Sequence, residues 1–218
     1  MYTRFAWRYF SAKKSANAIN IIAWVSVTAI VLITAAFIVL LSVFNGFEGL
    51  VKSLYSSFYA DIRVASPAGS LLRINDSTFG EIRSMPKIKG CSGVIEEKAL
   101  VQNGDFQTIA FLKGVEDDYK NVSGVSEKIV RGKFFLGTGE KPFLVLGGGL
   151  ENSLALDVER SIYPMVIYLF RKGLSLSPQE VQNFFASDNI YGAGTFFIQQ
   201  DIDTKYALTN ISFVRRMM

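Results

Sequence analysis

The most apolar stretch of the chain lies close to its N-terminus. No charged residue occurs between Lys14 and Glu48, and residues 19–44 are almost continuously apolar. At a rise of about 1.5 Å per residue, a helix of this length exceeds the roughly 30 Å thickness of a membrane's hydrocarbon core. The run has no polar stripe, and the apolar region of a secretory signal is shorter, at about 7–15 residues. The pattern therefore predicts a transmembrane helix over residues 16–44.

Beyond this run, apolar residues recur with helical spacing. From Phe47 onward they lie at i, i+3, i+4, i+7 and i+11, while lysine and serine occupy the other faces. The spacing predicts an amphipathic stalk over residues 45–59, in which Gly46 and Gly49 cost about 1 kcal/mol each relative to alanine. A lone membrane anchor needs no apolar stripe outside the membrane, so we expect these residues to contact a partner helix. The residues assigned to this contact, called the stalk stripe below, are Phe44, Phe47, Leu50, Val51, Leu54 and Phe58.

Residues 60–218 alternate between strand and helix patterns, which predicts a domain of the α+β class. A strand pattern covers residues 60–66. Asp76 is the expected N-cap of a short helix that ends before Pro86. Two strand patterns then flank Asn103-Gly104, which is a strong hairpin signal. Together these elements predict a β-α-β-β order, with a helix packed on an antiparallel sheet.

The second half of the domain has a similar mixture of patterns. The stretch "PFLVLGGGL" predicts a strand that enters a glycine-rich turn, and residues 163–170 predict another strand. Ser177 begins an expected helix that has Pro178 in its first turn and runs through Phe185. Residues 194–200 predict one more strand, and residues 209–218 begin a final helix.

The distribution of charge predicts an orientation in the membrane. The chain has 23 basic and 19 acidic residues; four basic residues (Arg4, Arg8, Lys13 and Lys14) precede the apolar run, which leaves 19 opposite the 19 acids. The positive-inside rule then places the N-terminus in the cytoplasm and everything after Phe44 in the periplasm. A neutral domain offers no basic stripe to nucleic acid. The aromatic and basic residues of segment 1–15 predict an elbow that contacts membrane lipid, with a plain flanking tail as the alternative.

Residues capable of catalysis are scarce. The chain has no histidine and a single cysteine, Cys91, for which a structural position in a strand is favoured over a nucleophile. The glycines of "LGGGLE" lack the Lys-Ser/Thr of a phosphate-binding loop, which favours a tight turn. Two acidic groups could bind a cation, although solvated turns are favoured. These groups are Glu116 with Asp117 and Asp118, and Asp201 with Asp203. We therefore expect no enzyme activity, no cofactor and no metal.

Residues 4–49 resemble the start of a known family. The stretch "RFAWRYFSAKKSANAINIIAWVSVTAI", followed by "VLLSVFNGFEG", is similar to the lipoprotein-releasing ABC transporter permeases of the LolC/LolE type. In that family an arginine- and tyrosine-rich elbow, a Lys-Lys or Lys-Ser pair, an Asn-Ile-Ile-like run and a "V-x-N-G-F" exit occur in this order. The combination is specific, whereas no single element is. Further on, "LVLGGGLENSLAL" and "FFIQQDIDTKYAL" resemble later segments of the family.

The resemblance implies a permease subunit of the bacterial inner membrane that releases lipoproteins and passes them to a periplasmic carrier. It implies a second permease subunit and a separate cytoplasmic ATPase as partners. It also implies a MacB-like periplasmic domain over residues 60–218, with two small lobes of which the second is inserted into the first. In one permease type of the family, a loop of the second lobe hooks the carrier. The residues at the corresponding place are Arg171, Lys172, Leu174, Leu176 and Gln179, and an ordinary strand-to-helix connection is the alternative.

The sequence departs from the family in two ways. It has "DVERSIYP" where the family often has Gly-Asp-x-Val, and it has no second apolar run where such permeases carry three more spans. We therefore expect a truncated or partial permease. Two other interpretations remain open: a MacB-like or FtsX-like mechanotransmission subunit with a different cargo, and a single-span membrane sensor or scaffold.

Overall fold

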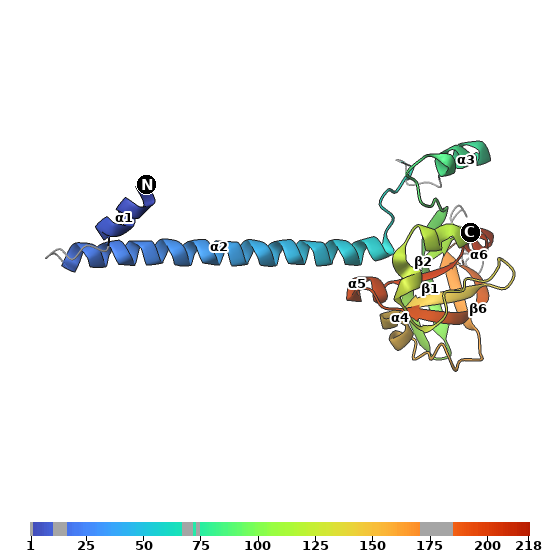
Figure 1. Cartoon of the computed structure of the whole chain (residues 1–218). Coiled ribbons are helices and arrows are strands. Elements are labelled where there is room, and N and C mark those ends of the chain that lie inside the picture. The colour runs from blue at the N-terminus through green and yellow to red at the C-terminus, as the bar shows by residue number, and fades with distance from the viewer. Residues whose placement is uncertain (1, 11–16, 67–71, 73–74, 171–184) are drawn as a thin grey trace. The chain divides into compact units, whose positions relative to one another are not determined.

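The computed structural model describes residues 2–10, 17–66, 72, 75–170 and 185–218 (Figure 1). The chain divides into two units, Met1–Lys52 and Ser53–Met218, which are described separately below. The first unit contains α1 (Tyr2–Phe10) and most of α2 (Asn17–Phe58).

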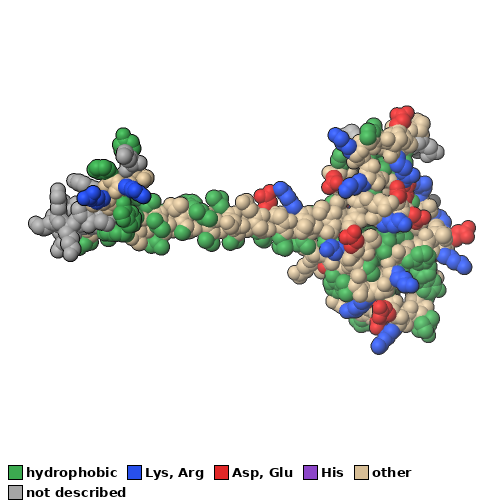
Figure 2. All heavy atoms as spheres, viewed as in Figure 1, with side chains coloured by type: hydrophobic (Ala, Val, Ile, Leu, Met, Phe, Trp, Pro, Cys, Tyr) green, Lys and Arg blue, Asp and Glu red, His purple; other side chains and the backbone are tan. Residues whose placement is uncertain are grey.

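Helix α2 has the properties of a membrane-spanning segment. Apolar side chains cover most of its length in Figure 2, and from Ile21 onward it is long and apolar enough to cross a membrane, as judged by length and composition. Three hydroxyl groups in the apolar part donate hydrogen bonds to the carbonyl oxygen four residues earlier. These bonds join Ser26 to Ile22 (2.9 Å), Thr28 to Trp24 (2.8 Å) and Thr34 to Ile30 (2.8 Å). The hydroxyl groups are thus satisfied inside the helix, as an apolar environment requires.

The helix continues past Gly46 and Gly49 without a break and ends at Phe58. This confirms the expectation that the two glycines are tolerated. A Cβ atom added at either glycine would meet nothing within 4 Å. Between them, Glu48 forms an exposed ion pair with Lys52 at 2.5 Å, with the i,i+4 spacing that supports a helix.

The second unit combines seven strands with short helices, so the expected α+β class is confirmed (Figure 1). Its strands are β1 (Val94–Asn103), β2 (Phe106–Val115), β3 (Ile129–Gly132), β4 (Phe143–Gly147), β5 (Met165–Phe170), β6 (Phe185–Phe196) and β7 (Tyr206–Asn210). Its helices are α3 (Asp76–Ser84), α4 (Gly148–Ser153), α5 (Gln200–Asp203), α6 (Ile211–Met217) and the 3-10 helices η1 (Asp117–Asn121) and η2 (Gly124–Lys128).

The strands form one mixed sheet in the order β3-β6-β4-β7-β2-β1-β5, and β6 also pairs with β5. Strand β6 is long enough to pair with β5 through residues 185–190 and with β4 through residues 191–196. Six strands therefore form a closed ring of neighbours, which leaves few unpaired edges. The β2–β7 and β4–β6 pairs are parallel, and the other pairs are antiparallel.

Buried apolar side chains form two clusters on the two faces of this sheet. Side chains alternate between faces along a strand, so Leu144 and Leu146 join the first cluster and Val145 joins the second. Helices α4 and α6 supply residues to the first cluster, while η1, η2 and the last turn of α2 supply residues to the second. All strands of the described residues therefore belong to one sheet, and the core has two parts; the expected division into two lobes stays a prediction.

Several elements differ from the sequence predictions. Residues 60–66 form no strand, and Ile62 and Val64, which the alternating pattern would place on a buried face, are 81% and 70% exposed. Helix α3 begins after Asn75 instead of Asp76, and the hairpin turn is Gly104-Asp105, with Gly104 at a φ of 57°. The strand expected at 194–200 ends at Phe196. The helix expected from Ser177 lies outside the described residues, apart from Phe185, which begins β6.

The glycine-rich segment is not the expected tight turn. Gly148 and Gly149 begin helix α4, which follows β4 directly. A Cβ atom at Gly147 would lie 2.3 Å from the backbone oxygen of Asp203, so this glycine is required by the close approach of α5. The glycines therefore serve close packing of two chain segments.

Candidate functional site at the end of helix α2

The last residue of α2, Phe58, is fully buried in the second apolar cluster of the domain. Its ring centroid lies 4.7 Å from that of Tyr206, 5.0 Å from that of Tyr59 and 6.0 Å from that of Phe196. Tyr206 comes from β7 and Phe196 from β6, so the phenylalanine reaches the central part of the sheet. Such aromatic contacts stabilise beyond the area that they bury. The end of the helix is therefore part of the domain core, and we call these contacts the aromatic joint.

A hydrogen bond also caps the C-terminal end of α2. The last carbonyl groups of a helix have no partner within it. The phenol of Tyr119, in η1, donates to the carbonyl oxygen of Phe58 at 3.0 Å, in a buried position. Burial raises the pKa of Tyr119 to about 12, so the phenol keeps its proton at neutral pH. Side chain and backbone of Phe58 are thus both held by the domain.

A lysine lies beneath these rings. Lys113, on β2, is only 6% exposed. Its Nζ atom lies 4.4 Å from the ring centroid of Phe58, 5.1 Å from that of Tyr119 and 5.5 Å from that of Tyr59. These distances are those of cation–π contacts. Burial lowers the pKa of Lys113 to about 8, and Glu96, its cross-strand neighbour on β1, acts in the opposite direction.

The stalk stripe is divided by the structure. Phe44, Phe47 and Leu50 are each about 60% exposed, while Val51 and Leu54 are half-buried. Phe58 lies in the domain core and cannot also contact a partner helix. The physical reason is local: the helix ends there, and the aromatic joint covers its last side chain. The sequence pattern placed Phe58 on the stripe because the period of the helix extends to its final residue.

The residues expected to contact a carrier (Arg171, Lys172, Leu174, Leu176 and Gln179) lie outside the described residues. The strands that flank this segment end in Phe170 and Phe185, which are register partners. Their rings lie 6.0 Å apart and both are more than half exposed.

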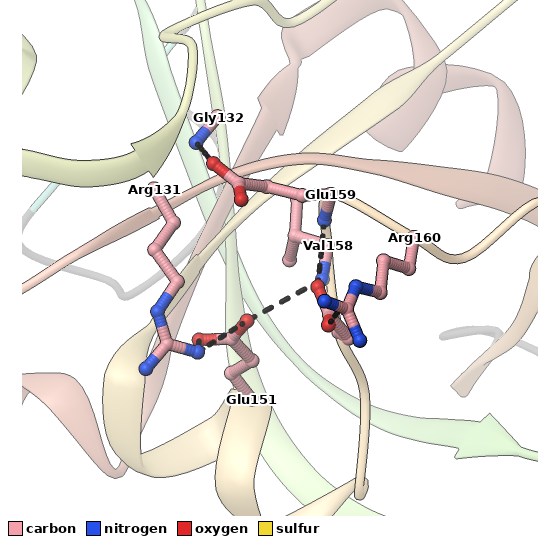
Figure 3. Close-up of polar contacts among 7 residues, drawn as sticks. Arg131, Gly132, Glu151, Val158, Glu159 and Arg160 are labelled. Carbon is pink, nitrogen blue, oxygen red and sulfur yellow. Dashed lines mark hydrogen bonds and ion pairs between the residues drawn. The ribbon is translucent and has the colours of Figure 1, made fainter.

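A cluster of polar contacts surrounds Glu151 of α4 (Figure 3). The carboxylate of Glu151 is 1% exposed, and both of its oxygens lie 3.3 Å from Nη1 of Arg131. The same carboxylate accepts a hydrogen bond from the backbone N–H of Val158 at 3.4 Å, and Glu159 accepts one from Gly132 at 3.3 Å. These contacts connect β3, α4 and the segment after α4, which indicates a structural role.

Several of the candidate cation ligands, for which solvated turns were favoured, have protein partners. Asp118 pairs with Arg83 at 3.3 Å, and Glu116 accepts a hydrogen bond from Gly93 at 3.1 Å. Asp203 is not in a solvated turn: it is buried, it accepts a hydrogen bond from Ile198 at 2.9 Å, and burial raises its pKa. Among the described residues, no group of three His, Cys, Asp or Glu could hold a metal ion.

Cys91 also differs from its expected place, because it lies before β1 and outside any strand, in a half-buried position.

Sequence reasoning missed most of the aromatic joint. Lys113 is a charged residue in an otherwise buried strand end, "FLKGV", which is the one signal that could have drawn attention to it. Tyr119 and Tyr206 lie 61 and 148 residues after Phe58 in the chain, and no local pattern connects them. Their meeting depends on the sheet order.

The fold places the chain in a general class: proteins in which a helix able to cross a membrane leads into an α+β domain. No family model matches the chain. Over 162 residues it is 30% identical to the lipoprotein-releasing system transmembrane protein LolE of Haemophilus influenzae. The match covers 70% of this chain and 38% of LolE, so the chain spans well under half the length of this relative. The likeness supports a relationship with LolC/LolE-like permeases, as the motifs indicated, and supports a membrane protein.

Proposed function

We propose that the chain acts as a permease-type subunit of an ABC transporter that releases lipoproteins from the inner membrane for transfer to a periplasmic carrier. The likeness to LolE supports this class of transporter over an enzyme. The observation that carries the proposal is the course of α2, which runs from the apolar segment to Phe58 in the domain core as one helix.

In this proposal, α2 transmits motion to the domain through the aromatic joint. A separate cytoplasmic ATPase supplies the energy, and a displacement of the membrane-embedded part of α2 reaches Phe58 along the hydrogen-bonded helix. From there it passes to β7 through Tyr206 and to η1 through Tyr119. A joint anchored by the fully buried rings of Phe58 and Phe196 is suited to this task, because close-packed interiors transmit strain.

The orientation in the proposal follows the charges. Arg4, Arg8, Lys13 and Lys14 precede the apolar segment and favour a cytoplasmic N-terminus. The domain from residue 45 onward would then be periplasmic, and segment 1–15 would contact membrane lipid. A reporter enzyme that is active only in the periplasm, fused after the exposed residue Val64, should be active. Activity of a cytoplasm-specific reporter at the same site would contradict the orientation.

The exposed part of the stalk stripe is the proposed contact with a second permease subunit. A cysteine at Phe47 should crosslink to that subunit, whereas a cysteine at Ser56 should not. Nine residues separate them, so at about 100° per residue they lie on opposite sides of the helix. Both variants are made with Cys91→Ser, which removes the single native cysteine. Equal crosslinking at both positions would show that the stripe is not an interface.

The contact with the carrier stays a prediction, since residues 171–184 lie outside the described part of the chain. Deletion of residues 174–177 should abolish carrier binding and leave thermal unfolding of the domain unchanged. If the deletion lowers the unfolding temperature by several degrees and carrier binding persists, the segment is a structural connection.

Purification from native membranes tests the function as a whole. The full chain is isolated in a mild detergent, and an ATPase subunit should co-purify in a fixed ratio. After reconstitution in proteoliposomes, ATP and a purified carrier should release acylated lipoprotein from the membrane. ATP-driven work without lipoprotein release would favour mechanotransmission with another cargo. Absence of any ATPase from the purified sample would contradict the permease proposal.

A further inference from the structure

The ammonium group of Lys113 lies in the aromatic joint without an ion-pair partner among the described residues. The side chain is 6% exposed, and its Nζ faces the rings of Phe58, Tyr119 and Tyr59. Glu96 is the register partner of Lys113 on β1, but no ion pair joins these two residues. The ammonium has thus exchanged water mainly for aromatic faces.

This arrangement costs stability. Removing a charged group from water is unfavourable unless a close counter-charge and hydrogen bonds replace the lost hydration. Contact with aromatic rings restores only part of that hydration. A methionine would fill the same space without the cost, because its side chain has similar length and no charge. A destabilising group at the point where α2 meets the domain therefore calls for a functional explanation.

We propose that Lys113 makes the aromatic joint releasable. When the last turn of α2 and Tyr59 move away from the sheet, water reaches the ammonium of Lys113, and its hydration lowers the free energy of the open state. The helix end is then held firmly enough to move the domain, but it separates at a lower free energy than a fully apolar joint. The inference concerns the opening of the joint, and it holds whether or not the cargo is a lipoprotein.

Charged and titratable groups from each neighbouring segment define the surroundings of Lys113. They are Glu96 on β1, Arg63 and Tyr59 after α2, Tyr119 on η1 and Tyr206 on β7. Glu96 raises the pKa of Lys113, while Arg63 lowers it. Burial raises the pKa of Tyr119 to about 12 and raises that of Tyr206 as well, so both phenols are neutral below pH 10. The pH dependence between pH 7 and pH 9.5 therefore comes mainly from Lys113.

The sign of this dependence follows from proton uptake on opening. In the closed joint, burial lowers the pKa of Lys113 from 10.5 to about 8. In the open joint the hydrated lysine regains its ordinary pKa, so between these values the open state binds more protons than the closed one. Opening is therefore easiest below pH 8 and becomes harder as the pH rises. The opening equilibrium should fall on the order of tenfold between pH 7 and pH 9.5.

Hydrogen–deuterium exchange of the full chain in detergent tests this inference. The reporter is the amide of Tyr59, which donates to the carbonyl of Tyr55 at 2.9 Å. Its protection, corrected for the intrinsic effect of pH on exchange, should rise on the order of tenfold between pH 7 and pH 9.5. The control is the amide of Val101, a buried residue on β1 far along the hairpin, whose protection should not follow this pattern.

Two variants separate charge from packing. In Lys113→Met, Tyr59 should be strongly protected at both pH values; in Lys113→Arg, it should be weakly protected at both, because arginine stays charged. The proposal is overturned if the methionine variant is less protected than the native chain at pH 7. Unchanged protection of native Tyr59 across the pH range overturns it equally, and that result needs no variant to fold. Neither measurement involves transport, so a failure here is distinct from a failure of the proposed function.

Discussion

Replacing Phe58 with alanine is the most direct test of how α2 is joined to the domain. Phe58 is fully buried, and its ring contacts Tyr59, Phe196, Tyr206 and the ammonium of Lys113. Truncation of a core phenylalanine costs about 3–5 kcal/mol, because apolar contacts are lost and a cavity remains. Here the cavity borders Lys113, so water that enters can hydrate the ammonium and offset part of the cost. We therefore expect about 3 kcal/mol, the lower end of that range.

This free energy converts to a measurable shift in unfolding temperature. For a unit of about 150–250 residues, each kcal/mol lowers the midpoint by about 2–4 °C, so Phe58→Ala should lower it by about 6–12 °C. The assay is thermal unfolding of the full chain in detergent, followed by near-ultraviolet circular dichroism, to which Tyr59, Tyr119 and Tyr206 contribute.

A matched control lies on the same helix. Phe47 is 62% exposed, so Phe47→Ala should change the stability of the domain by less than about 0.5 kcal/mol. The reasoning is refuted if Phe58→Ala leaves the midpoint within about 1 °C of the native value, or if both variants lower it equally. Either result would mean that the end of α2 does not contribute to the domain core.

Three further predictions concern other parts of the chain. Gly46→Ala and Gly49→Ala should each stabilise α2 by about 1 kcal/mol, because a Cβ atom at either position meets nothing within 4 Å. Amide exchange over residues 45–54 should then slow, and faster exchange would contradict the prediction. Loss of transport in a stabilised variant would indicate a closely packed partner helix. Arg131→Ala leaves the carboxylate of Glu151 buried without its counter-charge. It should lower the free energy of unfolding in urea by about 3 kcal/mol, whereas Glu151→Gln should lower it by about 1 kcal/mol. Equal losses would show that the charge of Glu151 is unimportant. Ala155 has a φ of 44° at the end of α4, where the N–H of Leu156 donates to the carbonyl of Glu151 at 3.0 Å. Ala155→Gly should therefore raise the free energy of unfolding in urea by about 0.5–1 kcal/mol; a lower free energy would rule out strain at this residue.

Local patterns in the sequence determined the elements that depend on near neighbours. The apolar run and the helical spacing after it predicted one long helix, and the structure has it as α2. The hairpin at Gly104 and the final helix from Ile211 also follow from nearby residues. The N-terminal positive charges and the apolar run likewise indicated a membrane segment without any knowledge of the fold.

Strands β3 and β7 and the strand wrongly predicted at residues 60–66 show what local sequence patterns cannot predict. Strand β3 has only four residues, and β7 lies in a segment with no alternation, so both depend on the strands beside them. Residues 60–66 show the converse: their alternating pattern predicted a strand, but the structure has none over these residues. Pairing between distant segments decides such cases, and local sequence does not contain it.

The aromatic joint was decided by the tertiary structure alone. The parallel pairing of β2 with β7 brings Lys113 and Tyr206 onto one face of the sheet, and η1 brings Tyr119 over the same face. This arrangement buries Phe58 in the domain core, whereas Phe47 stays exposed although both residues belong to the same helical pattern. Burial also changes the chemistry of Lys113, since a lysine on a strand is ordinarily solvated. The sequence specified a helix and the face on which its apolar residues lie; the sheet determined where that helix is held, because the groups that hold it meet only after the strands have paired.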